Sequence, residues 1–333
     1  MSTESMVRRS RLVRAAGALA LGLGLVAGVG CSQFAGLKAR KHFKDANGLY
    51  QQQDYRRAAA EYEEAIKADP EGIPEAYFFL GNSYDNLYKV GRKGEAINDG
   101  YLQDALKNYQ ISVDRLKGAT EPNKVVIWKR SLQYLAAVYA TDKLNEPDKA
   151  EPFVKQLIDV DPKDVSNYTG LAKIYEDAGK LDEAEATLKQ AEAAAPNDPG
   201  IASTIGEFYN RRGDFDKAMT AFEKMTQLEP NNPQNYYNLA VRFEEKTRKD
   251  YTIKAAQRAD YVKRGMAAVD KALEIRPDYF EALTYKGLML RQAANIARAG
   301  SPEQKRLLDE ADQFQKKAIE VQNLKSKGVG ATD

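Results

Sequence analysis

The side chains that most often carry acid–base, nucleophilic or metal chemistry are scarce in this sequence. Its 333 residues include one histidine, His42, and one cysteine, Cys31. A single thiol cannot form an intramolecular disulfide or a multi-thiolate metal site, and a single imidazole cannot build a histidine-rich one. We therefore predict no metal site and no cofactor. We expect His42 to pack within a helix rather than to act in catalysis.

The carboxylates offer no alternative chemistry at this level. Glu63–Glu64 and Glu244–Glu245 lie in segments with a helical pattern, where neighbouring side chains point roughly 100° apart and do not converge. After residue 30 the sequence has no glycine-rich phosphate loop, no His-Glu-x-x-His and no Gly-x-Ser-x-Gly motif. We predict that the protein is not an enzyme; acids converging in one cleft with perturbed pKa values would be needed to revive that possibility.

The charge of the chain is unevenly distributed. The formal net charge is +2, but residues 1–30 hold four arginines and one glutamate, so the remainder has 46 basic and 47 acidic side chains. A body that is close to neutral has no general electrostatic attraction for nucleic acid, and we predict no such partner.

The N-terminus has the pattern of an export signal. Arg8–Arg14 is basic and is followed by the uncharged stretch Ala15–Gly30, which ends at Cys31. As a helix that stretch is about 24 Å long, short of the ~30 Å hydrocarbon core of a bilayer. A basic start, a short apolar run and a small residue before the site of signal-peptide cleavage are typical of a secretory signal.

The cleavage region resembles that of bacterial lipoproteins, in which the cysteine is acylated and becomes the mature N-terminus. Val29, Gly30 and Cys31 match that pattern, whereas Gly28 stands where the family usually has leucine. The resemblance implies a signal peptide at 1–30 and an acylated (for example palmitoylated) Cys31 with a short tether at 31–38. It implies a membrane-anchored protein facing the periplasm; Ser32 favours the outer membrane, or the cell membrane in a single-membrane organism. An uncleaved anchor and a non-lipidated secreted form stay open.

A repeat follows the signal. Pro162, Pro196 and Pro230 are equally spaced along the chain, and the segments between them superpose. One reads Leu171-Ala172, Tyr175, Gly179, Ala184, Leu188 and Ala191; the next reads Ile205-Gly206, Tyr209, Gly213, Ala218, Phe222 and Met225. Both the pattern and the period, about 34 residues, resemble the tetratricopeptide repeat (TPR) family, whose unit is two antiparallel helices, A and B. Apolar residues three and four apart, small residues at close-contact positions and acid–proline helix stops agree with it.

The resemblance implies an all-α fold, a right-handed α-solenoid of stacked antiparallel helix pairs with about seven units over 39–325. A flexible tail is expected at 326–333. The predicted units are 39–72, 74–119, 129–164, 165–198, 199–232, 233–279 and 280–325. Trp128 is expected to precede helix A of the third unit and to pack between units two and three.

The second, sixth and seventh units are each about a dozen residues too long, because the small residue of helix B arrives late, at Ala105, Gly265 and Ala311. We expect these insertions between helices A and B, with Asp250 and Ser301–Pro302 beginning a lengthened helix B. Two interpretations stay open: the insertions are surface additions without a binding role, or they form an edge that contacts a partner or a membrane. Residues 242–264, with eight basic and four acidic side chains, are the candidate electrostatic contact.

In the family, helix A lines a concave groove that binds protein partners. Transferred to this chain, the groove positions are Asn47, Tyr50, Phe78, Asn82, Asp85, Lys173, Glu176, Asp177, Glu207, Arg211, Tyr237 and Glu244. Phe43 stands where carboxylate-clamping members have lysine, which disfavours binding of chaperone tails. The resulting hypothesis is a lipid-anchored scaffold that holds another envelope protein in an assembly or secretion machine, with its own oligomeric state open. The alternative is a carrier of a small envelope ligand, such as a lipid or peptidoglycan fragment, in a cavity lined by Tyr50, Phe78 and Tyr237.

Overall fold

A computed structural model describes residues 33–140 and 142–326. The predicted signal, Cys31 and the tail beyond residue 326 lie outside the described residues. The described chain is built from helices and short turns and has no strand, so the predicted all-α class of paired helices is confirmed. It divides into two compact units, which meet in sequence between Glu185 and Ala186 and are described separately below.

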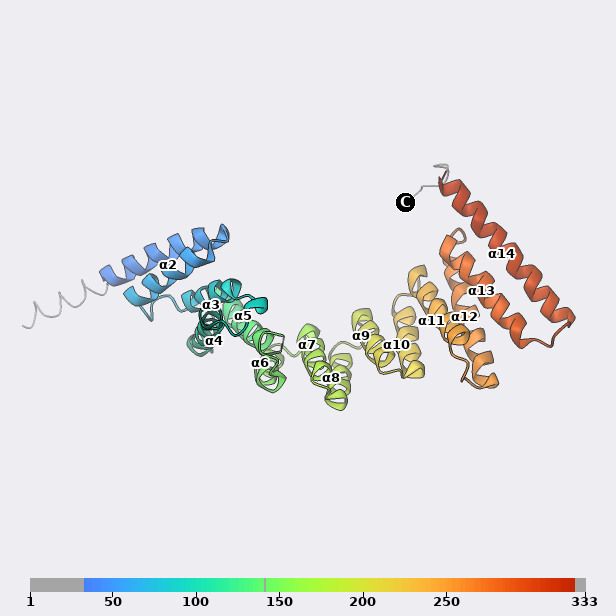
Figure 1. Ribbon diagram of the computed structural model, residues 1–333, viewed down its shortest axis with the longest axis horizontal. Coiled ribbons are helices and arrows are strands. Elements are labelled where there is room, and N and C mark those ends of the chain that lie inside the picture. The colour runs from blue at the N-terminus through green and yellow to red at the C-terminus, as the bar shows by residue number, and fades with distance from the viewer. Residues whose placement is uncertain (1–32, 141, 327–333) are drawn as a thin grey trace, which may run out of the picture. The chain divides into compact units, whose positions relative to one another are not determined.

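The first unit consists of consecutive helices that pack against their neighbours in the chain (Figure 1). It starts with a helical segment at 33–51. The following elements are α2 (Tyr55–Ala68), α3 (Glu75–Leu87), the 3-10 turn η1 (Val90–Arg92), α4 (Ala96–Leu116), α5 (Pro122–Ala140), α6 (Pro147–Val160) and α7 (Val165–Asp177). One core cluster joins 33–51, α2 and α3, and a second joins α3, α4, α5 and α6.

The second unit repeats the same arrangement. Helix α8 (Leu181–Ala194) spans the division between the units. It is followed by α9 (Pro199–Arg211), α10 (Phe215–Leu228), α11 (Pro233–Lys249), α12 (Ala255–Ile275), α13 (Phe280–Ile296) and α14 (Pro302–Ser326). The pairs α9–α10, α11–α12 and α13–α14 pack along their lengths.

The helix starts repeat with the sequence period. Asp164, Asp198 and Asn232 are equally spaced, and each accepts a hydrogen bond from the backbone N–H two residues later, which caps α7, α9 and α11. The tight turns inside the fourth and fifth repeats place Gly179 and Gly213 at φ of 73° and 77°, a conformation that glycine adopts without steric cost. The repeat period of the sequence is therefore the spacing of caps and turns in the structure.

The structure corrects three expectations about helix starts. Residues 33–38, expected to be a tether, are helical and continuous with the first helix, because only Gly36 among them is a poor helix former. Trp128 lies inside α5, which begins at Pro122, since proline is tolerated in a first helical turn. Asp250 ends α11 rather than beginning α12; its carboxylate accepts from the backbone of Thr252 at 2.9 Å.

The extra residues of the long repeats are distributed over the two helices and the turn that connects them. In the second repeat α3 keeps 13 residues while α4 has 21, and the connection contains η1. In the sixth repeat α11 has 17 residues and α12 has 21. Both are longer than their counterparts in the fifth repeat, α9 with 13 residues and α10 with 14. Helix α14 begins at Pro302, where the Ser301 hydroxyl accepts from the backbone N–H of Gln304.

Five of the eight cations in the basic stretch 242–264 form ion pairs within the second unit. Its ion pairs include Arg242–Glu207, Lys246–Asp250, Arg248–Glu244, Lys249–Glu245 and Arg264–Glu223. Arg258 instead donates to backbone carbonyls at the end of α11. A partner that contacts this stretch, as its composition predicts, would therefore compete with these ion pairs.

Buried tyrosines make the fold sensitive to high pH. Burial raises the pKa of Tyr109, and the nearby Asp85 charge raises it further; burial also raises the pKa of Tyr62. In the unfolded chain a tyrosine ionises near pH ~10. A group whose pKa is raised by folding stabilises the folded state fully below its unfolded pKa and loses that contribution as the pH rises.

We therefore expect the urea midpoint to fall progressively above pH ~10. In Tyr109→Phe the midpoint should start lower, because hydrogen bonds are lost, but decline less steeply with pH. The control Tyr251→Phe, at a position 87% exposed, should keep the wild-type decline. Equal slopes for all three proteins would show that Tyr109 does not contribute to the pH dependence.

Candidate functional site

The predicted groove residues of the first unit form an internal polar network instead of a free surface. The Asn82 amide, only 3% exposed, accepts from the Tyr50 hydroxyl at 2.5 Å and donates to the Tyr109 hydroxyl at 3.2 Å. Asp85 accepts from Tyr109 at 3.4 Å and pairs with Lys143. This network links the first helical segment, α3, α4 and the turn after α5. The spacing of its members along single helices does not reveal these contacts.

Two of these positions are buried inside the first unit. Phe78 is 2% exposed and belongs to a core cluster, with its ring 5.6 Å from that of Tyr134. Asn82 is equally buried, so changing it would disturb packing rather than a partner contact. Asn47 is half-buried and accepts from the Tyr62 hydroxyl at 2.7 Å.

The remaining predicted positions lie on α7 of the first unit and on α9 and α11 of the second. Lys173 and Asp177 pair with each other at 2.6 Å on the exposed face of α7, where Glu176 is half-buried. In the second unit Glu207 pairs with Arg242 at 2.5 Å, and Arg211 lies exposed at the end of α9. The ring of Tyr237 lies 5.3 Å from those of Tyr279 and Tyr285. Glu244 is 1% exposed and pairs with Arg248, so it too is unavailable to a partner.

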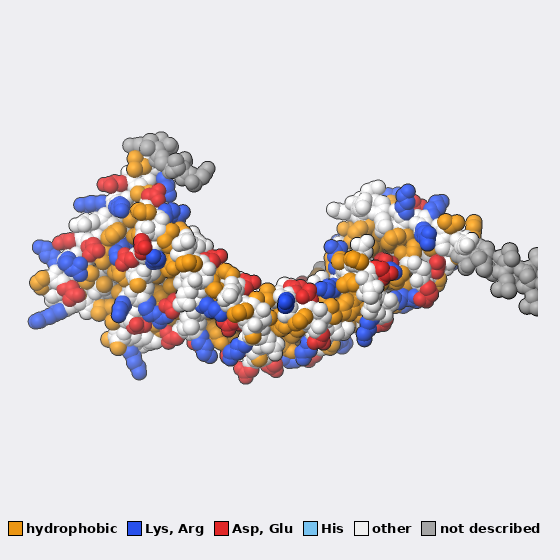
Figure 2. All heavy atoms as spheres, turned by 180° about the vertical axis from the view of Figure 1, so that it is seen from behind, with side chains coloured by type: hydrophobic (Ala, Val, Ile, Leu, Met, Phe, Trp, Pro, Cys, Tyr) orange, Lys and Arg blue, Asp and Glu red, His pale blue; other side chains and the backbone are white. Residues whose placement is uncertain are grey.

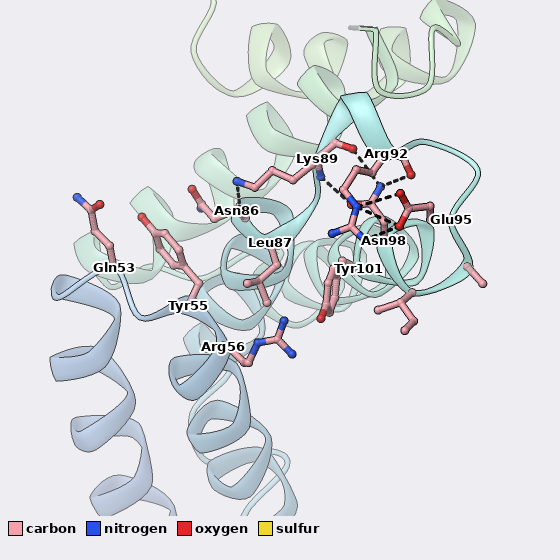
Figure 3. A pocket seen from close by; sticks show the side chains of 12 residues that line it. Gln53, Tyr55, Arg56, Asn86, Leu87, Lys89, Arg92, Glu95, Asn98 and Tyr101 are labelled. Carbon is pink, nitrogen blue, oxygen red and sulfur yellow. Dashed lines mark hydrogen bonds and ion pairs between the residues drawn. The ribbon is translucent and has the colours of Figure 1, made fainter.

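A hollow lies at another edge of the first unit, where helices A and B of the first two repeats are connected (Figure 3). We call it the insertion pocket. Its volume is about 920 Å³. It is lined by Gln53, Tyr55, Arg56, Asn86, Leu87, Lys89, Arg92, Glu95, Ala96, Ile97, Asn98 and Tyr101. Seven of these residues, from Lys89 to Tyr101, follow α3 and belong to the elongated connection or the start of α4.

One buried side chain holds the inserted turn in place. Asn98, 4% exposed, accepts from the Lys89 backbone N–H at 2.8 Å and donates to the Lys89 and Arg92 carbonyls at 3.0 and 3.1 Å. Arg92 and Glu95 close the turn with hydrogen bonds of 3.0 Å, and each shifts the pKa of the other, raising that of the guanidinium and lowering that of the carboxyl. The wall of the pocket is thus a folded element rather than a loose loop.

The pocket combines apolar walls with cations. Tyr101 stacks on Tyr84 at 6.0 Å, which fixes one aromatic wall. In Figure 3 the Arg56 guanidinium points toward Leu87 and Tyr101. Arg56 is exposed and makes no ion pair within the described part of the chain. Ile97 is 78% exposed, unusual for an isoleucine at the start of a helix. This arrangement suits a ligand with an anionic group beside an apolar one.

One feature of the sequence points to this pocket. The excess length of the second repeat is visible in the repeat pattern. The lining residues are not, because nothing in a single sequence shows that Asn98 folds the insertion back onto α3. The expected packing of His42 is confirmed in part: it is half-buried and lies 2.6 Å from the Glu61 carboxylate.

Residues 33–140 and 142–326 contain no group of three or more His, Cys, Asp or Glu side chains arranged to hold a metal ion. Over the same residues, every helix is too short or too polar to cross a membrane.

Comparisons with known proteins agree with the repeat pattern. Three family models described as tetratricopeptide repeat match residues 43–111, 143–206 and 202–232. No curated protein matches the sequence.

The fold is similar to several solved structures. The MamA protein is 20% identical, with a TM-score of 0.40 over 62% of this chain and 97% of its own. MamA 41-end from Desulfovibrio magneticus RS-1 is 17% identical, with a TM-score of 0.43 over 58% and 96%. YrrB, titled a TPR protein with an unusual peptide-binding site, is 18% identical, with a TM-score of 0.36 over 59% and 89%.

The hydrogen bonds of Asn98 make it a sensitive test of the pocket wall. Asn98→Ala removes three partly buried hydrogen bonds to the backbone of Lys89 and Arg92, which we expect to cost about 2 kcal/mol of unfolding free energy. The amide hydrogen of Lys89 should exchange faster than in the wild type. Gln103→Ala, at an exposed position of the same helix, is the control and should change neither quantity. An unchanged exchange rate at Lys89 in Asn98→Ala would contradict the role assigned to Asn98.

Proposed function

We propose, from the premise that the chain is a tetratricopeptide-repeat protein, that it is a scaffold that docks a segment of a partner protein in the insertion pocket. The observation that carries this proposal is the pocket itself: a folded insertion presents exposed Ile97 beside an aromatic wall, together with Arg56, which has no ion-pair partner among the described residues. Aromatic and arginine side chains are the residues that most often dominate binding energy at protein interfaces.

The chemistry of the pocket favours a partner segment with an acidic residue next to an aliphatic or aromatic one. Arg56 would pair with the carboxylate, while Leu87 and Tyr101 would contact the apolar side chain. The rim residues Gln53, Lys89 and Glu95 are exposed, so the pocket is open to the solvent along one side. An extended peptide can lie across such a pocket, whereas a small ligand would remain largely in water.

The alternative of a small-ligand carrier has weaker support. It required a cavity lined by Tyr50, Phe78 and Tyr237, and none of these lines the insertion pocket or the smaller hollow of about 380 Å³ between α13 and α14. Tyr50 and Phe78 pack instead in the core clusters of the first unit. We therefore favour a protein partner over a lipid or peptidoglycan fragment, and a scaffold over an enzyme.

The proposed scaffold is anchored in the bacterial envelope through an acylated Cys31. The support is the sequence: the basic residues of Arg8–Arg14, the apolar stretch Ala15–Gly30 and the lone cysteine that follows it. Only Ser32 separates Cys31 from the helical segment that begins at residue 33. In this proposal the first repeat, and with it the insertion pocket, is held close to the membrane that carries the lipid.

Capture of the partner tests the docking site. In Arg56→Glu/Ile97→Gln, two exposed side chains change, so the fold should persist while the amount of co-purified partner falls by about 10-fold or more. The measurement is quantitative mass spectrometry of proteins that co-purify from detergent-solubilised membranes.

The matched control is Arg298→Glu/Ile296→Gln, which makes the same changes at exposed positions next to the end of α13. It should retain capture. If both variants lose the same proteins, or neither does, the insertion pocket is not the docking site. Cys31→Ala tests the anchor separately: we expect the wild type to incorporate radiolabelled palmitate and Cys31→Ala not to, and a wild type without label, or equal labelling of both, would contradict the acylation.

A further inference from the structure

The outward face of the first helical segment has an unusual composition. Residues 33–44 contain four cations and no carboxylate, and within this stretch Phe34 is 74% exposed and Leu37 is 64% exposed. The cations are Lys38, Arg40, Lys41 and Lys44, all of them exposed. None of the four forms an ion pair within the described residues, in contrast to the paired cations of 242–264.

Helical geometry gathers these side chains on one side. At about 100° per residue, Phe34, Leu37, Lys41 and Lys44 fall within an arc of about 80°, flanked by Lys38 and Arg40. The opposite side packs inward, where the side chains of Ala39, Ala46 and Phe43 face the first repeat; both alanines are fully buried and Phe43 contacts the core.

The carboxylates around this face leave it with an excess of positive charge. Asp45, exposed at the next position after Lys44, is the one acidic side chain that borders the face. Glu61 and Asp69 come from α2 and the turn after it, where Glu61 pairs with His42 and Asp69 lies near Gly36. Four cations against one bordering carboxylate keep the outward face cationic.

The first helix of a repeat array has no preceding repeat to cover it, so its outer face is normally polar for solubility. Here that face instead carries two large apolar side chains among unpaired cations. In Figure 2 hydrophobic and basic side chains lie together at the end of the molecule where the described chain begins. Apolar residues among lysines and arginines are the composition of helices that lie in the interface of an anionic membrane.

We propose that the outward face of residues 33–44 rests on an anionic lipid bilayer, with Phe34 and Leu37 inserted among the headgroups and the four cations contacting lipid phosphates. The proposal rests on the membrane anchoring proposed above, because Cys31 precedes this helix by two residues. It adds a second attachment: an acyl chain alone lets the array swivel, whereas a helix lying in the interface fixes the direction in which the first repeat leaves the membrane.

Charge and apolarity together favour a bilayer over other occupants. A nucleic acid would use the cations but gain nothing from Phe34 and Leu37. A second copy of the same face would bring like charges together. An anionic bilayer complements both features, and each cation near its surface strengthens binding in a manner that salt weakens.

The test uses residues 32–333 without the lipid, since every described helix lies within them. We expect this protein to sediment with vesicles of equal parts phosphatidylglycerol and phosphatidylcholine at low salt, and not with vesicles of phosphatidylcholine alone. Lys41→Gln/Lys44→Gln should weaken vesicle binding by about 10-fold or more. The matched control Lys316→Gln/Lys317→Gln, which removes the same charge from exposed positions of α14, should bind as the wild type does.

Insertion of the apolar side chains has its own readout. In Phe34→Trp we expect the tryptophan emission to shift to the blue on addition of anionic vesicles, above the constant signal of Trp128, which is 8% exposed. Absence of wild-type binding to anionic vesicles, or equal losses in the two lysine variants, would overturn the proposal. Tighter binding to a short DNA duplex than to vesicles would identify the wrong occupant. Because the protein tested has no acyl chain, these outcomes are independent of the acylation of Cys31.

Discussion

The close approach of neighbouring helices at small residues is the constraint on which the rest of the structure depends. A Cβ atom on Gly206 would lie 2.6 Å from the ring of Phe222, and one on Gly81 would lie 2.9 Å from the ring of Tyr109. A Cβ on Gly287 would meet the backbone oxygen of Ala311 at 3.2 Å. In a packed interior such overlaps force the facing ring or backbone to shift, so the helix pairs keep their spacing only while these positions stay small. The aromatic rings that fill the adjoining space, and the caps that recur once in each repeat, follow from that spacing.

The long repeats satisfy the same constraint while adding residues elsewhere. In the second repeat, Gly81 still meets Ala105 and Tyr109, so the contact between α3 and α4 is that of an ordinary unit. The additional residues lie beyond this contact, where α4 begins earlier and Asn98 binds the inserted turn back onto the end of α3. A pocket therefore forms at the edge of the array without disturbing its core. This separation of packing from insertion explains how a structural repeat can carry a binding surface of its own.

The periodic part of the fold could be predicted from the sequence, and the side-chain surroundings could not. Pro162, Pro196 and Pro230 set the period, and the tyrosines assigned to packing, such as Tyr175 and Tyr209, are 7% and 8% exposed. Transfer of groove positions was less successful, since Phe78, Asn82 and Glu244 are buried in this chain. The position of a residue along a helix gives the face on which it lies. It does not show whether a neighbouring repeat or turn supplies a hydrogen-bond partner, as Tyr50 does for Asn82. The insertion pocket escaped prediction for the same reason, because its wall depends on the hydrogen bonds of Asn98.

Site-specific photo-crosslinking in intact membranes tests the central claim, that a partner segment docks at the insertion pocket, most directly. A photoreactive benzoylphenylalanine in place of Ile97 would stand at the rim of the pocket, and the same residue in place of Tyr251, 87% exposed in the turn after α11, serves as the comparison. The account predicts one discrete adduct of defined mass from position 97 and none from position 251. The same adducts from both positions, or none from position 97 while the partner still co-purifies, would contradict it.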